Sequence, residues 1–92
     1  MAPKESYRNH GQVPNLSSYR QDPVLVALGQ AIRRARLERK LSQEELALRA
    51  GIDRSHMGRI ERGDNNVAVL TLAKIAHVMD VTVASLVADA KL

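Results

Sequence analysis

Apolar side chains recur at helical spacing through residues 23–92, and no stretch alternates as a strand does. The first helical stretch opens with Asp22 and Pro23, an N-cap residue followed by a first-turn proline. Its apolar stripe consists of Leu25, Leu28, Ile32 and Ala35. This pattern predicts a first helix from Pro23 to about Lys40.

Two short helices are predicted to follow. Ser42 and Glu45 have the spacing of a capping box, in which each side chain accepts a hydrogen bond from the backbone N–H of the other residue. The helix that starts at Gln43 should end at Gly51, because glycine adopts the positive φ common at helix ends. Asp53 is the expected cap of the next helix, over residues 54–62.

The last third of the chain predicts two more helices. A fourth helix, from about Val69 to Met79, is indicated by Leu72, Ile75, Ala76 and Met79, which follow the i, i+3, i+4, i+7 pattern. We expect Asp80 in the turn position that a glycine usually fills, and Thr82 as the cap of a short fifth helix through about Ala88. The expected fold is all-α, with five helices forming one domain over residues 23–92.

The third predicted helix has two different faces. On a helical wheel Met57 and Ile60 point inward, and the opposite face consists of Arg54, Ser55, Gly58, Arg59 and Arg62. The small Ala47 and Ala50 allow the preceding helix to cross closely. Residues 43–62 therefore have the spacing of a helix-turn-helix. The alternative is a solvated helix in an ordinary bundle.

Arg36 lies at the edge of the apolar face of the first helix, where an unpaired guanidinium would be costly. Glu61 lies beside the inward face of the third helix. We therefore predict an Arg36–Glu61 ion pair that ties the first helix to the third and holds the third in orientation. The alternative is two independent surface charges.

The formal net charge is +4 at pH 7, and the basic side chains are concentrated around the two short helices. Residues 33–62 contain nine Lys or Arg and five Asp or Glu, whereas residues 63–92 contain two and three. This asymmetry favours a polyanionic partner, with nucleic acid ahead of an anionic membrane surface. A membrane helix needs an apolar stripe beside the basic one, and the third helix has too little of it.

Residues 1–22 are rich in Ser, Asn, Gln, Pro and Gly and lack periodicity, which predicts a flexible N-terminal arm. Its Lys4, Arg8 and Arg20 could contact a phosphate backbone or a minor groove. The acidic Glu5 and Asp22 reduce its net charge, so an arm without specific contacts is the favoured interpretation.

Several kinds of chemistry have no support in the sequence. No cysteine is present, so there is no disulfide, thiolate metal site or catalytic thiol, in keeping with a reducing cytosol. His10, His56 and His77 are dispersed without an i, i+4 pair, so no metal site is expected. No nucleophile elbow, P-loop or dinucleotide motif occurs. We therefore expect no enzyme and no cofactor.

Residues 25–88 resemble the DNA-binding domain of phage repressors, Cro proteins and XRE-type bacterial regulators. The resemblance is carried by the order and spacing of IRRARLERKLSQEELALRAGID, IERG and LAKIAHVMDVTVASL. It implies a five-helix lambda-repressor-like domain whose second helix crosses the phosphate backbone and whose third helix enters the major groove of double-stranded DNA.

The predicted DNA-binding residues are Gln43, Arg54, Ser55, His56, Arg59, Arg62, Asn65 and Asn66. By resemblance, Gln43 contacts a phosphate at the start of the second helix. Arg54, Ser55 and Arg59 match the base-reading positions, where arginine can bind guanine O6 and N7. The two asparagines match a loop that approaches the backbone, with Arg62 assisting, and His56 flanks this surface. The Arg36–Glu61 pair also matches an ion pair of the family.

Three features depart from the family pattern. Met57 replaces the usual branched aliphatic residue and is expected to fill the core. Gly58 costs about 0.5–1 kcal/mol relative to alanine inside a helix. The absence of a side chain either lets the helix backbone approach DNA or makes the helix less rigid, and both interpretations remain open. Val67 stands where the family commonly has proline and Ala68 is a poor cap, which leaves the start of the fourth helix open.

The sequence therefore predicts a sequence-specific transcriptional regulator, a repressor that binds a palindromic operator as a homodimer. Candidates for the dimer surface are Val83, Leu86, Val87 and Leu92, although burial in the monomer core is an equal alternative for Leu86. The alternative function is an antitoxin or helical protein-interaction module whose main partner is a protein. With no secretion signal or bilayer-spanning apolar run, we expect a cytoplasmic, nucleoid-associated protein of a bacterium or phage.

Overall fold

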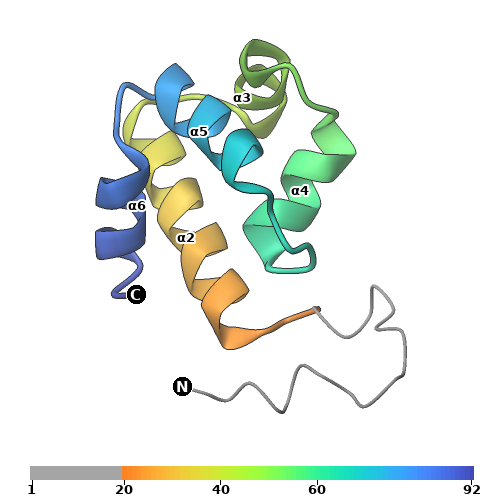
Figure 1. Cartoon of the computed structure of the whole chain (residues 1–92). Coiled ribbons are helices and arrows are strands. Elements are labelled where there is room, and N and C mark those ends of the chain that lie inside the picture. The colour runs from red at the N-terminus through yellow and green to blue at the C-terminus, as the bar shows by residue number, and fades with distance from the viewer. Residues whose placement is uncertain (1–19) are drawn as a thin grey trace.

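The computed structural model describes residues 20–92. Most of the predicted arm, including Lys4, Arg8 and His10, lies outside the described residues. The described part contains five helices and no strand, which confirms the all-α prediction. These helices are α2 (Pro23–Glu38), α3 (Gln43–Ala50), α4 (Arg54–Arg62), α5 (Val69–Val78) and α6 (Val83–Asp89). Figure 1 shows α4 and α6 on opposite sides of α2, with α3 and α5 across one end of it.

The helix ends follow the local chemistry closely. Asp22 accepts a hydrogen bond from the backbone N–H of Val24, and Thr82 accepts one from Ser85, so both predicted N-caps are confirmed. The capping box of Ser42 and Glu45 is also present, with both hydrogen bonds formed. Each of these bonds satisfies a backbone donor that the first turn of a helix leaves free.

Two helices are followed by a residue with positive φ, as expected. Gly51 ends α3 with φ of 74°, and Asp80 follows α5 with φ of 57°. The first helix stops at Glu38, slightly before the predicted end, because Lys40 has φ of 56° and cannot continue a right-handed helix.

Other helix ends differ from the prediction. Asp53 occupies the N-cap position of α4, but its side chain makes no capping hydrogen bond, so the predicted cap is wrong in that respect. Ala68 likewise precedes α5 without a side-chain cap. The α6 helix extends to Asp89, just beyond its expected end.

The core is aliphatic and lies between all five helices. Its largest fully buried side chains are Ile32, Leu46, Met57, Ile75 and Met79. Ala47 and Ala50 are buried where α3 packs against its neighbours, as predicted from their small size. The inward positions of α4 therefore join it to the same core that the other four helices share.

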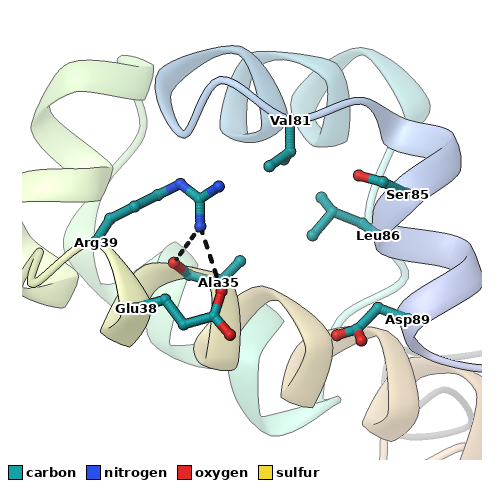
Figure 2. Close-up of a pocket in the computed structure, with 7 residues that line it drawn as sticks. All are labelled: Ala35, Glu38, Arg39, Val81, Ser85, Leu86 and Asp89. Atoms are coloured by element: carbon teal, nitrogen blue, oxygen red, sulfur yellow. Dashed lines mark hydrogen bonds and ion pairs between the residues drawn. The ribbon is translucent and has the colours of Figure 1, made fainter.

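Arg39 links the end of α2 to the end of α5. Its Nε donates to the carbonyl oxygen of Met79 at 2.6 Å, and its Nη1 donates to the carbonyl oxygen of Ala35 at 2.9 Å. The guanidinium lies beside a hollow of about 230 Å³ between α2 and α6 (Figure 2), lined by Ala35, Glu38, Arg39, Val81, Ser85, Leu86 and Asp89. The hydrogen bonds of Arg39 are thus made to backbone carbonyl groups of the domain, on the side of α2 away from α4.

Within residues 20–92, no single helix has both the length and the apolar composition needed to cross a membrane, and α5 and α6 meet that test only together, across a 94° bend.

Candidate nucleic-acid interface

Helix α4 presents a basic and polar face to solvent. Its inner residues Met57 and Ile60 are buried against the core, whereas Arg54, Ser55 and Arg59 are exposed on the outside. The spacing of these three residues places them on one side of the helix. A surface of this kind offers two guanidinium groups and a hydroxyl to one groove of a polyanion.

A buried ion pair connects α4 to α2. Nε of Arg36 lies 2.7 Å from Oε2 of Glu61, and Nη2 of Arg36 lies 3.0 Å from Oε1. Both residues are 6% exposed. The two parallel bonds form a bidentate pair, and Nη1 of Arg36 also donates to the carbonyl oxygen of Leu41 at 2.9 Å. Each of the three guanidinium nitrogens of Arg36 thus donates a hydrogen bond, two of them to Glu61, so α4 is held in one orientation relative to α2.

Gln43 extends the pair to a third helix. Its Nε2 donates to Oε1 of Glu61 at 3.0 Å, so the carboxylate of α4 accepts from both α2 and α3. Gln43 is half-buried at the first position of α3. One of its two amide N–H bonds is therefore used within the fold, and the other remains for the phosphate contact that the sequence predicts.

The C-terminal end of α4 is tied to the start of the described chain. Gln21 donates from its backbone to Gly63, and its side-chain Nε2 donates to the carbonyl oxygen of Arg62 at 2.9 Å and to Oδ1 of Asp64 at 2.7 Å. Nε of Arg62 lies 3.0 Å from Oδ2 of Asp64. Gln21 belongs to the segment predicted as a flexible arm, yet it holds this turn in place.

These contacts also affect the ionisation of Asp64. Hydrogen bonds from the side chain of Gln21 and then from Arg62 stabilise the carboxylate and lower the pKa of Asp64 below its ordinary value. At the start of α3, hydrogen bonds from the backbone N–H and hydroxyl of Ser42 lower the pKa of Glu45 in the same way. Both carboxylates are therefore charged at neutral pH.

The remaining predicted contact residues lie around the same helix. Arg62 is exposed at its end, His56 is half-buried, and in the following loop Asn65 is half-buried and Asn66 is exposed. The fold thus gathers the residues selected from the sequence on α4, on its flanking loop and at the start of α3.

The candidates for the dimer surface do not form a uniform set. Leu86 is 2% exposed and belongs to the monomer core, so it is corrected from a surface candidate to a core residue. Val83 is partly buried and packs against that core, and Val87 is also half-buried. Leu92 is 52% exposed and is the candidate most open to a partner.

Sequence reasoning missed several contacts of this site. It placed Gly58 on the solvent face of α4, but Gly58 is buried. It also gave no role to Gln21 and did not pair Gln43 with Glu61. Amide side chains follow no spacing rule comparable to a capping box, so these bonds become visible only once the helices are packed.

Among residues 20–92, no group of three His, Asp or Glu side chains is placed to hold a metal ion. His56 and His77 both lie in this part of the chain, on α4 and α5.

Comparison with known proteins agrees with this geometry. Residues 32–86 match the helix-turn-helix family. The chain is 36% identical over 64 residues to the immunity repressor protein of Bacillus phage phi105, a match that covers 70% of this chain and 44% of the repressor. The chain thus spans less than half of that relative.

Solved structures are similar over most of their own length. The restriction-modification controller protein C.AhdI from Aeromonas hydrophila is 42% identical, with a TM-score of 0.66 over 67% of this chain and 94% of that protein. SinR, a master regulator for biofilm formation solved in complex with DNA, is 38% identical, with a TM-score of 0.62 over 64% and 95% of the two chains.

Proposed function

The chain belongs to the helix-turn-helix family of DNA-binding transcriptional regulators, and on this premise we propose that it is a repressor that binds a palindromic operator as a homodimer. In this proposal α4 enters the major groove and α3 crosses the phosphate backbone. The chain acts in the cytoplasm, where its DNA lies.

The observation that carries the proposal is the pairing of an exposed basic face with a rigid support. Arg54, Ser55 and Arg59 are exposed on α4, while Glu61 in its last turn is held by the buried bond to Arg36. Base reading requires such support, because a bidentate arginine contact depends on the angle at which the helix enters the groove. A solvated helix in an ordinary bundle has no need of it.

The contacts divide into two kinds. Arg54, Ser55 and Arg59 read base edges, and each bidentate arginine contact to guanine contributes about 1–3 kcal/mol of discrimination. Backbone contacts are made by the remaining residues around the helix, namely Gln43, His56, Arg62, Asn65 and Asn66. These contacts hold the protein in register and carry no sequence information directly.

Dimerisation follows from the small footprint of one reading helix. Two copies related by a two-fold axis place their α4 helices about 34 Å apart, one turn of DNA, and double the number of bases read. We assign the dimer surface to α6 and the end of the chain, with Leu92 at its centre and Val87 and Val83 beside it. Figure 1 places this end across α2 from α4, so a partner there leaves the reading face free.

The test is selection of DNA by the purified protein. A library of random duplexes is bound at two salt concentrations, and the recovered sequences are read. We expect a palindromic consensus, with an affinity that falls steeply as salt rises because phosphate contacts release counterions. Salt-sensitive binding without any selected sequence would contradict the proposal and favour a module whose cationic face meets an acidic protein.

A further inference from the structure

Gly58 lies in the middle of α4 and is buried, yet the fold gives it no reason to be glycine. Its backbone is helical, and no positive φ is involved. A Cβ atom at this position would approach two atoms most closely, at 3.2 Å from Nη1 of Arg62 and 3.4 Å from Oε1 of Gln43. Both atoms are at the ends of flexible side chains.

The glycine next to α4 in the adjoining turn is different. A Cβ on Gly63 would lie 2.8 Å from backbone atoms of Val26, and Gly63 has φ of 81°. Packing and conformation therefore both require glycine at position 63. At position 58 the backbone conformation does not require glycine, and the nearest neighbours of a Cβ are the ends of two side chains. The reason for this glycine therefore lies with those two side chains.

Those two side chains are anchored where they lie. Gln43 donates to the buried carboxylate of Glu61, and Arg62 is paired with Asp64. Each of these bonds holds the polar end of a long side chain in place. Gln43 therefore reaches Gly58 from α3, and Arg62 reaches it from the last turn of α4. They form a polar layer that lies directly on the helix backbone.

We propose that Gly58 is a positioning residue for phosphate binding: its missing side chain lets Gln43 and Arg62 lie flat against α4, where both reach the DNA backbone. The proposal rests on the DNA-binding function proposed above. Any side chain at position 58 lifts this layer outward, so that Gln43 and Arg62 no longer meet the phosphates well and binding weakens by a similar factor at every sequence.

This role predicts that stability and binding change in opposite directions. Gly58→Ala removes the helix penalty of glycine, and the exposed end of the Arg62 side chain can shift by the few tenths of an ångström that the new Cβ needs, so Tm should rise by about 2–6 °C. Affinity for the selected operator should fall by about three- to tenfold, the scale expected when neighbouring side chains are coupled. The preferred sequence should not change, because phosphate contacts carry no base information.

Gln30→Ala is the matched control, since it also raises helix propensity but lies at an exposed position of α2. It should raise Tm without changing the affinity. If Gly58→Ala binds the operator as tightly as the wild type, or lowers Tm, the inference is overturned. If the wild type itself selects no DNA, the proposed function fails first, which is a different result.

A second measurement separates the polar layer from direct approach of the helix backbone to DNA. In a Gln43→Ala/Arg62→Ala background the layer is absent, so adding Gly58→Ala should change affinity by less than about twofold. If the added substitution still lowers affinity by its full factor, Gly58 acts through its own backbone and the inference is wrong. Affinities are measured by fluorescence anisotropy on a labelled operator at one salt concentration.

Discussion

Gly29 of α2 packs directly against the main chain of Glu61 in α4. A Cβ atom at Gly29 would lie 2.5 Å from the carbonyl oxygen of Glu61 and at the same distance from that of Ile60. The two helices thus approach each other by backbone contact at the last turn of α4. This contact sets the distance across which Arg36, seven residues further along α2, reaches the Glu61 carboxylate.

Gly29→Ala should therefore destabilise the fold by about 2–3 kcal/mol, because a rigid backbone cannot move aside and α2 must separate from α4. The free energy of unfolding in urea measures this loss. Ala27→Gly, a half-buried neighbour on the same helix, provides a comparison in which only helix propensity and a small contact are lost. If Gly29→Ala were as stable as the wild type, the close approach would be wrong.

Breaking the buried pair from one side should be more harmful than removing it entirely. Arg36→Met leaves the Glu61 carboxylate buried with only Gln43 as a side-chain partner, and should cost about 3–5 kcal/mol of unfolding free energy. Adding Glu61→Leu removes the uncompensated charge, so the double variant should recover part of that loss. A double-mutant cycle in urea gives the coupling, and losses that simply add would show that the two charges act independently.

The helices themselves were predictable because their signals are local. The capping box of Ser42 and Glu45 depends on residues three apart, and the turn at Asp80 depends on one residue that tolerates a left-handed conformation. The burial of Met57 and Ile60 on α4 follows from helical spacing alone. For the same reason the resemblance to a family, carried by these signals, gave the correct order of elements.

The close contacts of the site were not predictable, since they depend on distances between helices. Gly29 looks like any helix glycine until α4 is placed against it, and Gly58 lies on the outward side of a wheel that cannot show Gln43 reaching across from α3. Asp53 has the right residue type for a cap, but its side chain makes no capping hydrogen bond. The spacing of residues predicts the apolar face of a helix, whereas the packing of the helices determines which side chains cover each face.

Acid should weaken the turn that follows α4. Hydrogen bonds from Gln21 and then Arg62 keep the pKa of Asp64 below the value it has in the unfolded chain. A carboxylate of this kind stabilises the fold above its unfolded pKa, about 4, and the stabilisation is lost as the pH falls through the lower folded pKa. Asp64→Asn, which cannot titrate, should therefore show a smaller decrease in Tm between neutral and acidic pH than the wild type.

Glu45 has a lowered pKa from its bonds to Ser42 and acts in the same direction, so the variant should retain part of the acid sensitivity. Glu45→Gln in addition should flatten the profile further. Equal pH profiles for the wild type and Asp64→Asn would mean that the contacts of Asp64 add nothing to folding.

Substitutions of base-reading residues and of residues that contact the DNA backbone should differ in their effect on sequence specificity. Arg54→Ala and Arg59→Ala should each relax the preference at one base pair of the half-site, with a loss of about 1–3 kcal/mol on the best operator and less on others. Gln43→Ala should weaken all sites by a similar factor. Sequencing of selected DNA measures the preference, and an unchanged consensus for Arg54→Ala would remove that residue from the reading set.

The dimer proposal makes a prediction at the end of the chain. Leu92 is exposed and carries no buried contact of the monomer core, so Leu92→Glu should leave the fold intact while a charge at the centre of an apolar interface shifts the protein to monomer. Sedimentation velocity measures the shift, and the variant should lose affinity for the full palindrome while binding a half-site as before.

Leu70→Glu, at a leucine that is 68% exposed on α5, is the control that should stay dimeric. Leu86→Glu should unfold the protein because Leu86 is in the core, so only the Leu92 variant separates assembly from folding. A dimer that persists in Leu92→Glu would place the interface elsewhere on the molecule.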